Sequence, residues 1–231
     1  MTAHRSFAAL LLASACALGW PTAQADTQRS PSTPQKSPRM THPNTTALLA
    51  NLISLNHQET SRRTVAVDKE TAQLTRYERK DGRHAGLGGE HVSTVVAANG
   101  TLQGFANMSL DLVGKPLPTP ARTEAIARSF LQSHAPDLLP RMQISWIKPH
   151  DEPIRVQRGG RAETVTLTGM KLKARNLSDG RWFWVIVGSD EQAMVFERDI
   201  VWISFPGHRQ TEKWLHDSWL KTQNHRAAER L

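Results

Sequence analysis

The chain has 231 residues, 39% of them hydrophobic and 22% charged, and its formal net charge is +8. This length and composition support one substantial hydrophobic core and exclude a disordered polymer. The only cysteine, Cys16, lies in an apolar N-terminal segment, so the rest of the chain offers no disulfide, thiolate zinc site or cysteine nucleophile. The basic charge suits an anionic partner and serves solubility equally well.

Residues 1–25 have the three parts of a secretory signal peptide. The basic pair His4-Arg5 precedes an apolar run, Phe7–Leu18, and the small-residue motif Ala23-Gln24-Ala25 follows. We therefore expect an exported protein, periplasmic or secreted, that begins at Asp26 after cleavage. Lipidation at Cys16 is the alternative, because the residues before it resemble a bacterial lipobox. Beyond this leader, no apolar stretch of the sequence is long enough to span a membrane.

The next two segments differ in composition. Residues 26–43 are rich in Ser, Thr, Pro and Gln and are predicted to form a flexible linker. Residues 44–112 are predicted to hold an N-terminal helix, which ends near Asn56, and then two hairpins. In the second hairpin Asn99-Gly100 joins two β-rich runs, which is typical of a type I′ turn.

Residues 113–222 are predicted to hold a helix, a four-stranded meander and a C-terminal helix. Thr119 can cap the first helix, Pro120 suits its first position, and Pro136 stops it. A polar excursion over residues 149–160 separates the first strand of the meander from the second. The C-terminal helix is expected from Arg209 to Thr222, and residues 223–231 form a polar tail. We expect residues 44–222 to form one continuous domain.

The predicted order of a strand, a helix and four antiparallel strands resembles that of cystatin-like folds. It indicates an α+β protein in which one helix packs on a curved antiparallel sheet of four to five strands, with further helices near the N and C termini. The phrase PTPARTEAIARSFLQSHAPDLL resembles the helix that opens PepSY-type secreted domains, through Thr123, Glu124, Ala125, Ala127, Phe130 and Leu131. PepSY-type domains are associated with protease propeptides and inhibition, so the resemblance implies binding rather than turnover. The Gln-x-Val-x-Gly loop of cystatin inhibitors is absent from the sequence.

The register of the meander can be derived from its turns. A four-residue loop at Ser189–Gln192 pairs Trp184 with Glu197, Trp182 with Asp199 and Phe183 with Arg198. Because side chains alternate across a sheet, two faces follow. The core face is predicted to carry Leu172, Ala174, Phe183, Val185, Val187, Phe196, Ile200 and Trp202, and the second face Lys171, Lys173, Arg175, Trp182, Trp184, Ile186, Glu197 and Asp199.

The sequence contains none of the common catalytic or cofactor-binding motifs, and we expect no cofactor and no metal site. His84 and His91 flank the glycine-rich stretch 86–89, but no third metal ligand accompanies them. A glycine-rich loop that binds phosphate is followed by a helix, whereas a strand is predicted to follow here. We therefore predict a mobile loop. The best catalytic candidates are Glu197 and Asp199, whose apolar neighbours could raise one carboxyl pKa. The cations on the same face argue instead for a cross-strand ion-pair ladder.

The tryptophans give the second interpretation of this face. Trp182 and Trp184 need cover, and Trp214 and Trp219 of the C-terminal helix are predicted to supply it; otherwise the indoles form a stacking platform for a sugar or peptide. Trp146 and Trp202 are predicted to pack in the core. The candidate ligand surface therefore consists of Lys173, Arg175, Trp182, Trp184, Glu197, Asp199, Trp214 and Trp219.

The sequence thus predicts an exported, non-enzymatic envelope module that binds a protein, a peptide or a cell-envelope polymer. Two alternatives stay open: a small hydrolase or isomerase that uses Glu197 or Asp199, and an electrostatic binder of an anionic polymer. Sequence-specific binding of nucleic acid is not expected.

Overall fold

The computed structural model describes residues 49–228, and all of its regular elements lie in this range. The predicted signal peptide and linker therefore lie outside the described residues, as does the end of the predicted tail. The strands of the main sheet are β1 (His57–Val67), β2 (Glu70–Arg79), β3 (His91–Ala97), β4 (Leu102–Met108), β5 (Met142–Arg158), β6 (Arg161–Asn176), β7 (Trp182–Val187) and β8 (Ala193–Ile200). The other elements are η1 (Leu110–Leu112), α2 (Pro120–His134), η2 (Pro136–Arg141), β9 (Trp202–Ile203), β10 (His208–Arg209) and α3 (Asp217–Ala228).

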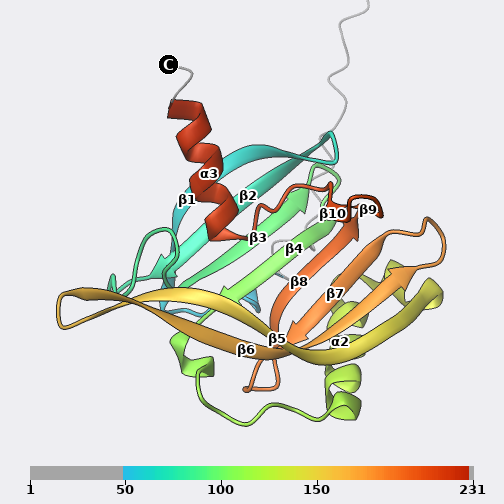
Figure 1. Ribbon diagram of the computed structural model, residues 1–231, viewed down its shortest axis with the longest axis horizontal. Helices are drawn as coiled ribbons and strands as arrows, with labels where there is room; N and C mark the ends of the chain where they lie inside the picture. Colours follow the sequence, from blue (N-terminus) through green and yellow to red (C-terminus); the bar gives the residue numbers. More distant parts are fainter. Residues whose placement is uncertain (1–48, 229–231) are drawn as a thin grey trace, which may run out of the picture. The chain divides into compact units, whose positions relative to one another are not determined.

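The eight long strands form one antiparallel sheet in the order β1-β2-β3-β4-β8-β7-β6-β5 (Figure 1). Each half of the sheet is a four-stranded meander, and the two halves meet where β4 pairs with β8, with Phe105 opposite Phe196. The predicted hairpins β1–β2 and β3–β4 and the predicted succession of four strands after α2 are confirmed. What unites them is the β4–β8 contact.

The cystatin-like fold class is wrong. That fold places one helix on a sheet of four to five strands, whereas here the N-terminal hairpins join the C-terminal meander in a single sheet of eight strands. The physical reason is that β4 is the last strand of the N-terminal meander and β8 the last strand of the C-terminal one, so each would have a free edge. When the two strands pair, each satisfies the backbone hydrogen-bonding groups of the other. No local pattern in either strand announces this pairing.

Helix α2 packs on the first face of the sheet, as its apolar stripe requires. Thr119 caps it by accepting a hydrogen bond from the backbone nitrogen of Arg122 at 3.2 Å. Phe130 packs against Phe105 and Phe196, with ring centroids 6.3 and 5.3 Å apart. The residues predicted for the core face that lie in this cluster are Leu172, Ala174, Phe183, Val185, Val187 and Phe196.

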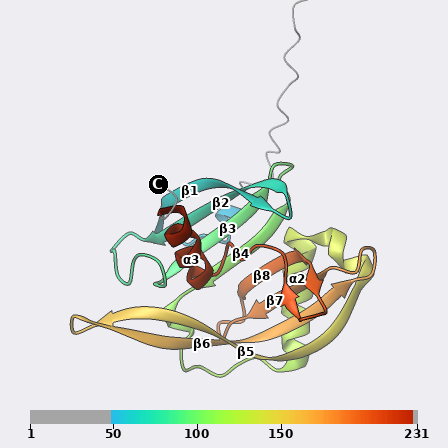
Figure 2. The same cartoon turned by 45° about the horizontal axis from the view of Figure 1, so that its top comes forward.

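The second face of the sheet is covered by elements that the sequence placed incorrectly. Strands β5 and β6 pair along their whole length, but β6 pairs with β7 only over Met170–Arg175, so the far half of the hairpin continues past β7 as an arm (Figures 1 and 2). Ile154 and Leu167 of this arm are buried in the same cluster as Trp184 and Ile186. The polar excursion predicted over residues 149–160 is therefore wrong, because its alternate residues are the buried face of a strand.

Helix α3 also lies on this face, over β2 and β3, where its Leu220 joins the same cluster. It begins at Asp217 rather than at Arg209, since residues 208–209 form β10, which pairs with β9. The N-terminal helix predicted to end near Asn56 stops at Ala50, and turns follow it. Within residues 49–228, no helix is both long and apolar enough to cross a membrane.

Candidate functional site

The residues predicted to form one ligand surface are spread over the second face of the sheet. Trp184 and Glu197 are cross-strand partners in its middle, as predicted. Lys173 and Arg175 pair with Trp184 and Trp182, also as predicted. Trp182 and Arg175 are paired at the end of the sheet where β7 begins.

The other predicted members lie elsewhere. The indole nitrogen of Trp214 donates a hydrogen bond to the backbone oxygen of Ala66 at 2.7 Å, and Trp214 meets Trp219 edge to face at 4.6 Å between ring centroids. These two rings therefore cover β1, and the predicted cover of Trp182 or Trp184 by Trp214 or Trp219 is wrong. Trp184 is buried instead beneath two cations, with Nζ of Lys171 4.1 Å and the guanidinium of Arg209 5.5 Å from its ring centroid.

A β-bulge separates Asp199 from Glu197. Trp182 pairs with Ile200 rather than with Asp199, because β8 carries one extra residue between its contacts with Trp182 and Trp184. Asp199 takes a left-handed backbone conformation, with φ of 57°, and its carboxylate accepts a hydrogen bond from Nε of Arg198. As a result Ile200 is buried on the second face, and the predicted Trp182–Asp199 pair does not form.

Glu197 is the most constrained carboxylate of this face. It is 3% exposed, forms an ion pair with Arg209 at 2.7 Å and accepts a hydrogen bond from the indole nitrogen of Trp184 at 3.1 Å. Nε2 of His216 lies 3.1 Å from its second oxygen. Burial acts to raise the pKa of Glu197, but the charge and hydrogen bond of His216, with those of Arg209, outweigh it and lower the pKa to about 2. A carboxylate held so firmly ionised does not serve as a general acid near neutral pH.

The same contacts affect the neighbouring bases. Burial acts to lower the pKa of His216, yet the Glu197 carboxylate outweighs it and raises the pKa above 6.5. Burial lowers the pKa of Lys171 to about 8. The middle of the second face is therefore a buried ion-pair network that fixes the chain ahead of α3 to β8.

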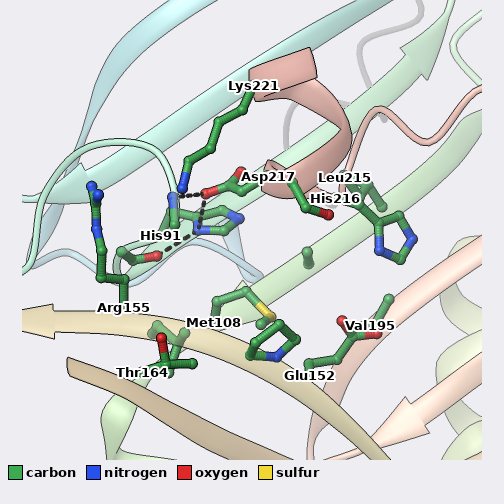
Figure 3. A pocket seen from close by; sticks show the side chains of 16 residues that line it. His91, Met108, Glu152, Arg155, Thr164, Val195, Leu215, His216, Asp217 and Lys221 are labelled. Carbon is green, nitrogen blue, oxygen red and sulfur yellow. Dashed lines mark hydrogen bonds and ion pairs between the residues drawn. The ribbon is translucent and has the colours of Figure 1, made fainter. Parts of the chain in front are cut away.

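A cavity of about 330 Å³ opens beside this network, beneath the start of α3 (Figure 3). Its walls come from β3 and β4, the glycine-rich loop, the β5–β6 arm and α3. Its apolar lining includes Ala106, Met108, Ile154, Val195 and Leu215. Its polar lining includes His91, Glu152, Thr164, His216, Asp217 and Lys221.

Asp217, the first residue of α3, organises one wall of the cavity. Its carboxylate accepts a hydrogen bond from Nη1 of Arg76 at 2.9 Å and another from the backbone nitrogen of Gly88. The loop is also tied to the arm, since the backbone nitrogen of Arg155 donates to the oxygen of Gly88 at 2.5 Å. The loop predicted to be mobile is therefore held by a helix terminus and by a strand edge.

His91 lies at the base of this wall and is 3% exposed. Its Nδ1 lies 2.9 Å from the carbonyl oxygen of Gly89, which can only accept, so Nδ1 carries the hydrogen and Nε2 has a free lone pair. Burial, with the adjacent charge of Arg76, lowers the pKa of His91 to about 4, so the ring is neutral near pH 7. Among the described residues nothing hydrogen-bonds to Nε2 of His91.

Glu152 places a second acceptor in the cavity, from the arm. Its side chain is 13% exposed, and one of its oxygens lies 3.2 Å from Nε2 of His150. Figure 3 shows Glu152 on the arm side of the cavity, with His91 and Asp217 towards the glycine-rich loop. The cavity thus combines an apolar wall with two acceptors, Glu152 and Nε2 of His91, and the basic side chains of Arg155 and Lys221 also line it.

The sequence missed most of this cavity. The sequence indicates His91 only as a possible metal ligand, predicts a mobile loop for the glycine-rich stretch and places Glu152 in a polar excursion. Over residues 49–228, no group of three or more His, Cys, Asp or Glu side chains is placed to hold a metal ion. The signal that could have pointed to Glu152 is the apolar alternation of Ile154 and Val156, which would have identified the strand.

Comparison of the sequence with models of known protein families, with curated proteins and with solved structures gave no match.

Proposed function

We propose that the protein is a non-enzymatic binding module whose cavity takes a small apolar amine, such as the amino end of a short apolar peptide. The observation that carries this proposal is the unpaired Nε2 of His91, a buried acceptor in the wall of a cavity that also holds the Glu152 carboxylate. A buried acceptor without a partner is unfavourable, and a ligand N–H would satisfy it. The negative charge of Glu152 favours an ammonium over a neutral donor.

The apolar lining determines the remainder of the ligand. Ala106 and Met108 of β4, Val195 of β8 and Leu215 of the segment before α3 line the cavity and belong to one apolar cluster. A cavity of about 330 Å³ lies at the small end of the range for ligand sites, so the ligand is the size of one aromatic or branched aliphatic group. The PepSY-type resemblance of α2 also supports binding rather than turnover.

The enzymatic alternative has less support. Glu197 is held ionised by three donors, and Asp199 is separated from it by the bulge. His91 has the orientation of a general base, with Asp217 3.8 Å from its Nδ1, but none of the described serine or threonine hydroxyls is hydrogen-bonded to it. A catalytic base without a nucleophile beside it is better explained as a ligand-binding group.

A matched series of head groups tests the proposal by calorimetry. Phenethylamine, 2-phenylethanol and 3-phenylpropionate share an aromatic body and differ in the group that would reach His91 and Glu152. We expect phenethylamine to bind best and the carboxylate not to bind. Glu152→Gln should weaken the binding of phenethylamine by about tenfold, the usual loss for one charged contact, and leave the binding of 2-phenylethanol unchanged.

Glu163→Gln is the control, because Glu163 lies on the same hairpin, pairs with Arg158 and does not line the cavity. It should bind phenethylamine as the unchanged protein does. Tighter binding of 3-phenylpropionate than of phenethylamine, or equal loss in both glutamate variants, would contradict the proposal.

The cellular location is part of the same proposal. The predicted leader supports an exported protein, periplasmic or secreted, in which this module acts in the envelope. Intact-mass measurement of the exported protein is expected to give a chain that begins at Asp26. A mass that includes residues 1–25, or an acylated Cys16, would contradict plain cleavage.

A further inference from the structure

A second feature lies away from the cavity, at the end of the sheet where β7 begins. Nζ of Lys173 lies 4.3 Å from the ring centroid of Trp182, 5.8 Å from that of Trp146 and 5.7 Å from that of Trp202. The three rings come from β5, β7 and β9, so the sheet has gathered them from distant parts of the chain around one ammonium group. We name Trp146, Lys173, Arg175, Trp182 and Trp202 the tryptophan platform.

Parts of the platform are open to solvent although they are apolar. Trp202 is 48% exposed and Trp146 is half-buried, so the prediction that both pack in the core is wrong. Trp182 is half-buried as well. The exposed large hydrophobic residues within residues 49–228 are Leu55, Leu177, Trp202 and Phe205. Three of these four lie in the turn between β6 and β7 or in the β9–β10 hairpin, the two loops next to the platform. Such clustering is typical of an interaction surface rather than of scattered exposure.

The platform also carries positive charge that the described residues do not neutralise. Arg175 is exposed, its Nε donates to the backbone oxygen of Gly180 at 3.0 Å, and its guanidinium lies 5.8 Å from the Trp182 centroid. Within residues 49–228, neither Arg175 nor Lys173 forms a salt bridge with a carboxylate. Both cations are therefore free to pair with an anionic ligand, in a chain whose formal net charge is +8.

The neighbouring strand edge is unsuited to a peptide. Added peptide strands need a regular edge, because their main chain supplies most of the affinity. Here the outermost strand, β5, has a bulge between Ile144 and Trp146, and Pro149 follows. Bulges and prolines interrupt edge pairing. Flat aromatic faces beside cations are instead suited to flat rings that carry negative charge.

We propose that the tryptophan platform binds a carboxylated polysaccharide, with sugar rings stacked on Trp202 and neighbouring indoles and uronate carboxylates paired with Arg175 and Lys173. One face of a pyranose ring exposes mainly C–H groups, so its contact with an indole removes apolar surface from water. The carboxylates satisfy cations that have no protein partner. This inference is independent of the cavity proposal, since no residue of the platform lines the cavity.

Titration of the full chain with a galacturonate hexamer, followed by tryptophan fluorescence and calorimetry, tests the inference. We expect binding that weakens as salt is added, and no competition from phenethylamine. The methyl-esterified hexamer, which keeps the rings and loses the charges, should bind at least about tenfold more weakly. Trp202→Ala should also weaken binding by about tenfold, the usual effect of removing one stacking ring.

Matched variants separate the platform from general charge attraction. Arg175→Gln should weaken binding of the hexamer by about tenfold. Arg161, at the tip of the β5–β6 hairpin, is also exposed, and Arg161→Gln should not weaken it. A poly-aspartate peptide and a single-stranded oligothymidine of the same charge test other polyanions. If either binds as tightly as the hexamer, or if Trp202→Ala has no effect, the platform is not a polysaccharide site. Because Trp202 is exposed, its variant should unfold at an unchanged urea concentration.

Discussion

Nε2 of His216 lies 3.1 Å from Oε2 of Glu197, and this contact joins the segment before α3 to the central strand β8. The next residue, Asp217, is bound in turn by Arg76 of β2 and by the backbone of Gly88. Two consecutive residues thus attach α3 to different strands of one sheet. The start of α3, which lies over the cavity, is therefore held in place by buried ion pairs, and the stability of the fold should depend on them.

Replacing Glu197 by glutamine should destabilise the protein strongly. The amide cannot accept all three contacts, and Arg209 would lose its buried counter-charge. Breaking a buried ion pair of this kind costs about 3–5 kcal/mol of unfolding free energy. Urea denaturation followed by circular dichroism measures the change. Glu191→Gln is the control, because Glu191 pairs with Arg122 at the surface, and it should leave the urea midpoint unchanged.

The two buried histidines should make stability depend on pH in opposite directions. His91 has a folded pKa lowered from 6.5 to about 4, so the folded state binds fewer protons and its stability falls as the pH falls through this interval. His216 has a folded pKa raised above 6.5, so its contribution is present below pH 6.5 and is lost as the pH rises through the raised value.

Urea midpoints measured across this range separate the two histidines. His91→Gln should remove the loss of stability just below pH 6.5, above the range in which protonation of Glu197 adds its own loss, and His216→Gln should remove the loss on the alkaline side. If the His91→Gln variant still loses stability just below pH 6.5, then His91 is not the group whose protonation causes that loss.

A comparison of two phenylalanines tests the packing of the sheet. Phe183 is 1% exposed beneath α2, and Phe205 is 91% exposed in the β9–β10 hairpin. Phe183→Ala should lower the unfolding free energy by about 3–5 kcal/mol through lost contacts and a cavity. Phe205→Ala should change it by less than about 0.5 kcal/mol. Similar losses in urea melts would mean that Phe183 is not packed beneath α2 or that Phe205 is not exposed.

The close approach of Leu215 to β4 gives a further test. A Cβ atom at Gly104 would lie 2.7 Å from Cδ1 of Leu215, which is closer than carbon atoms pack. Gly104→Ala should therefore displace Leu215 and cost about 1–3 kcal/mol. In a double-mutant cycle, Leu215→Ala should remove most of this penalty. Strictly additive effects would show that the segment before α3 does not rest on β4.

The local elements of this protein are largely encoded in the order of its residues. The Thr119 cap, Pro120 and the apolar stripe through Phe130 and Leu131 predict α2, which runs from Pro120 to His134. The pairs Trp184–Glu197 and Lys173–Trp184 follow from turn length and side-chain alternation. Period and turn chemistry act over a few residues, so they can be read without knowledge of the rest of the chain.

Misplaced elements of the second face show where local patterns are insufficient. The bulge at Asp199 moves Ile200 to the second face, and no glycine marks it in the sequence. Asp199 tolerates the left-handed conformation, but one aspartate within a strand pattern does not predict a bulge. The arm over residues 149–160 looks polar because one of its faces is solvated, while Ile154 and Val156 are buried by contact with distant strands. Which side of the arm is buried depends on the strands that it packs against, and those strands are far from it in the sequence.

The sequence by itself determined the helix α2, the strands outside the arm and the β9–β10 hairpin, and the side-chain alternation as far as the bulge at Asp199, because these depend on propensity and period within a few residues. Only the tertiary structure decided that β4 pairs with β8, that α3 and the arm meet over the second face, and that His91, Glu152 and Asp217 surround one cavity. Those contacts join residues from separate segments, and their stability comes from burial and charge pairing that arise only after the sheet has formed.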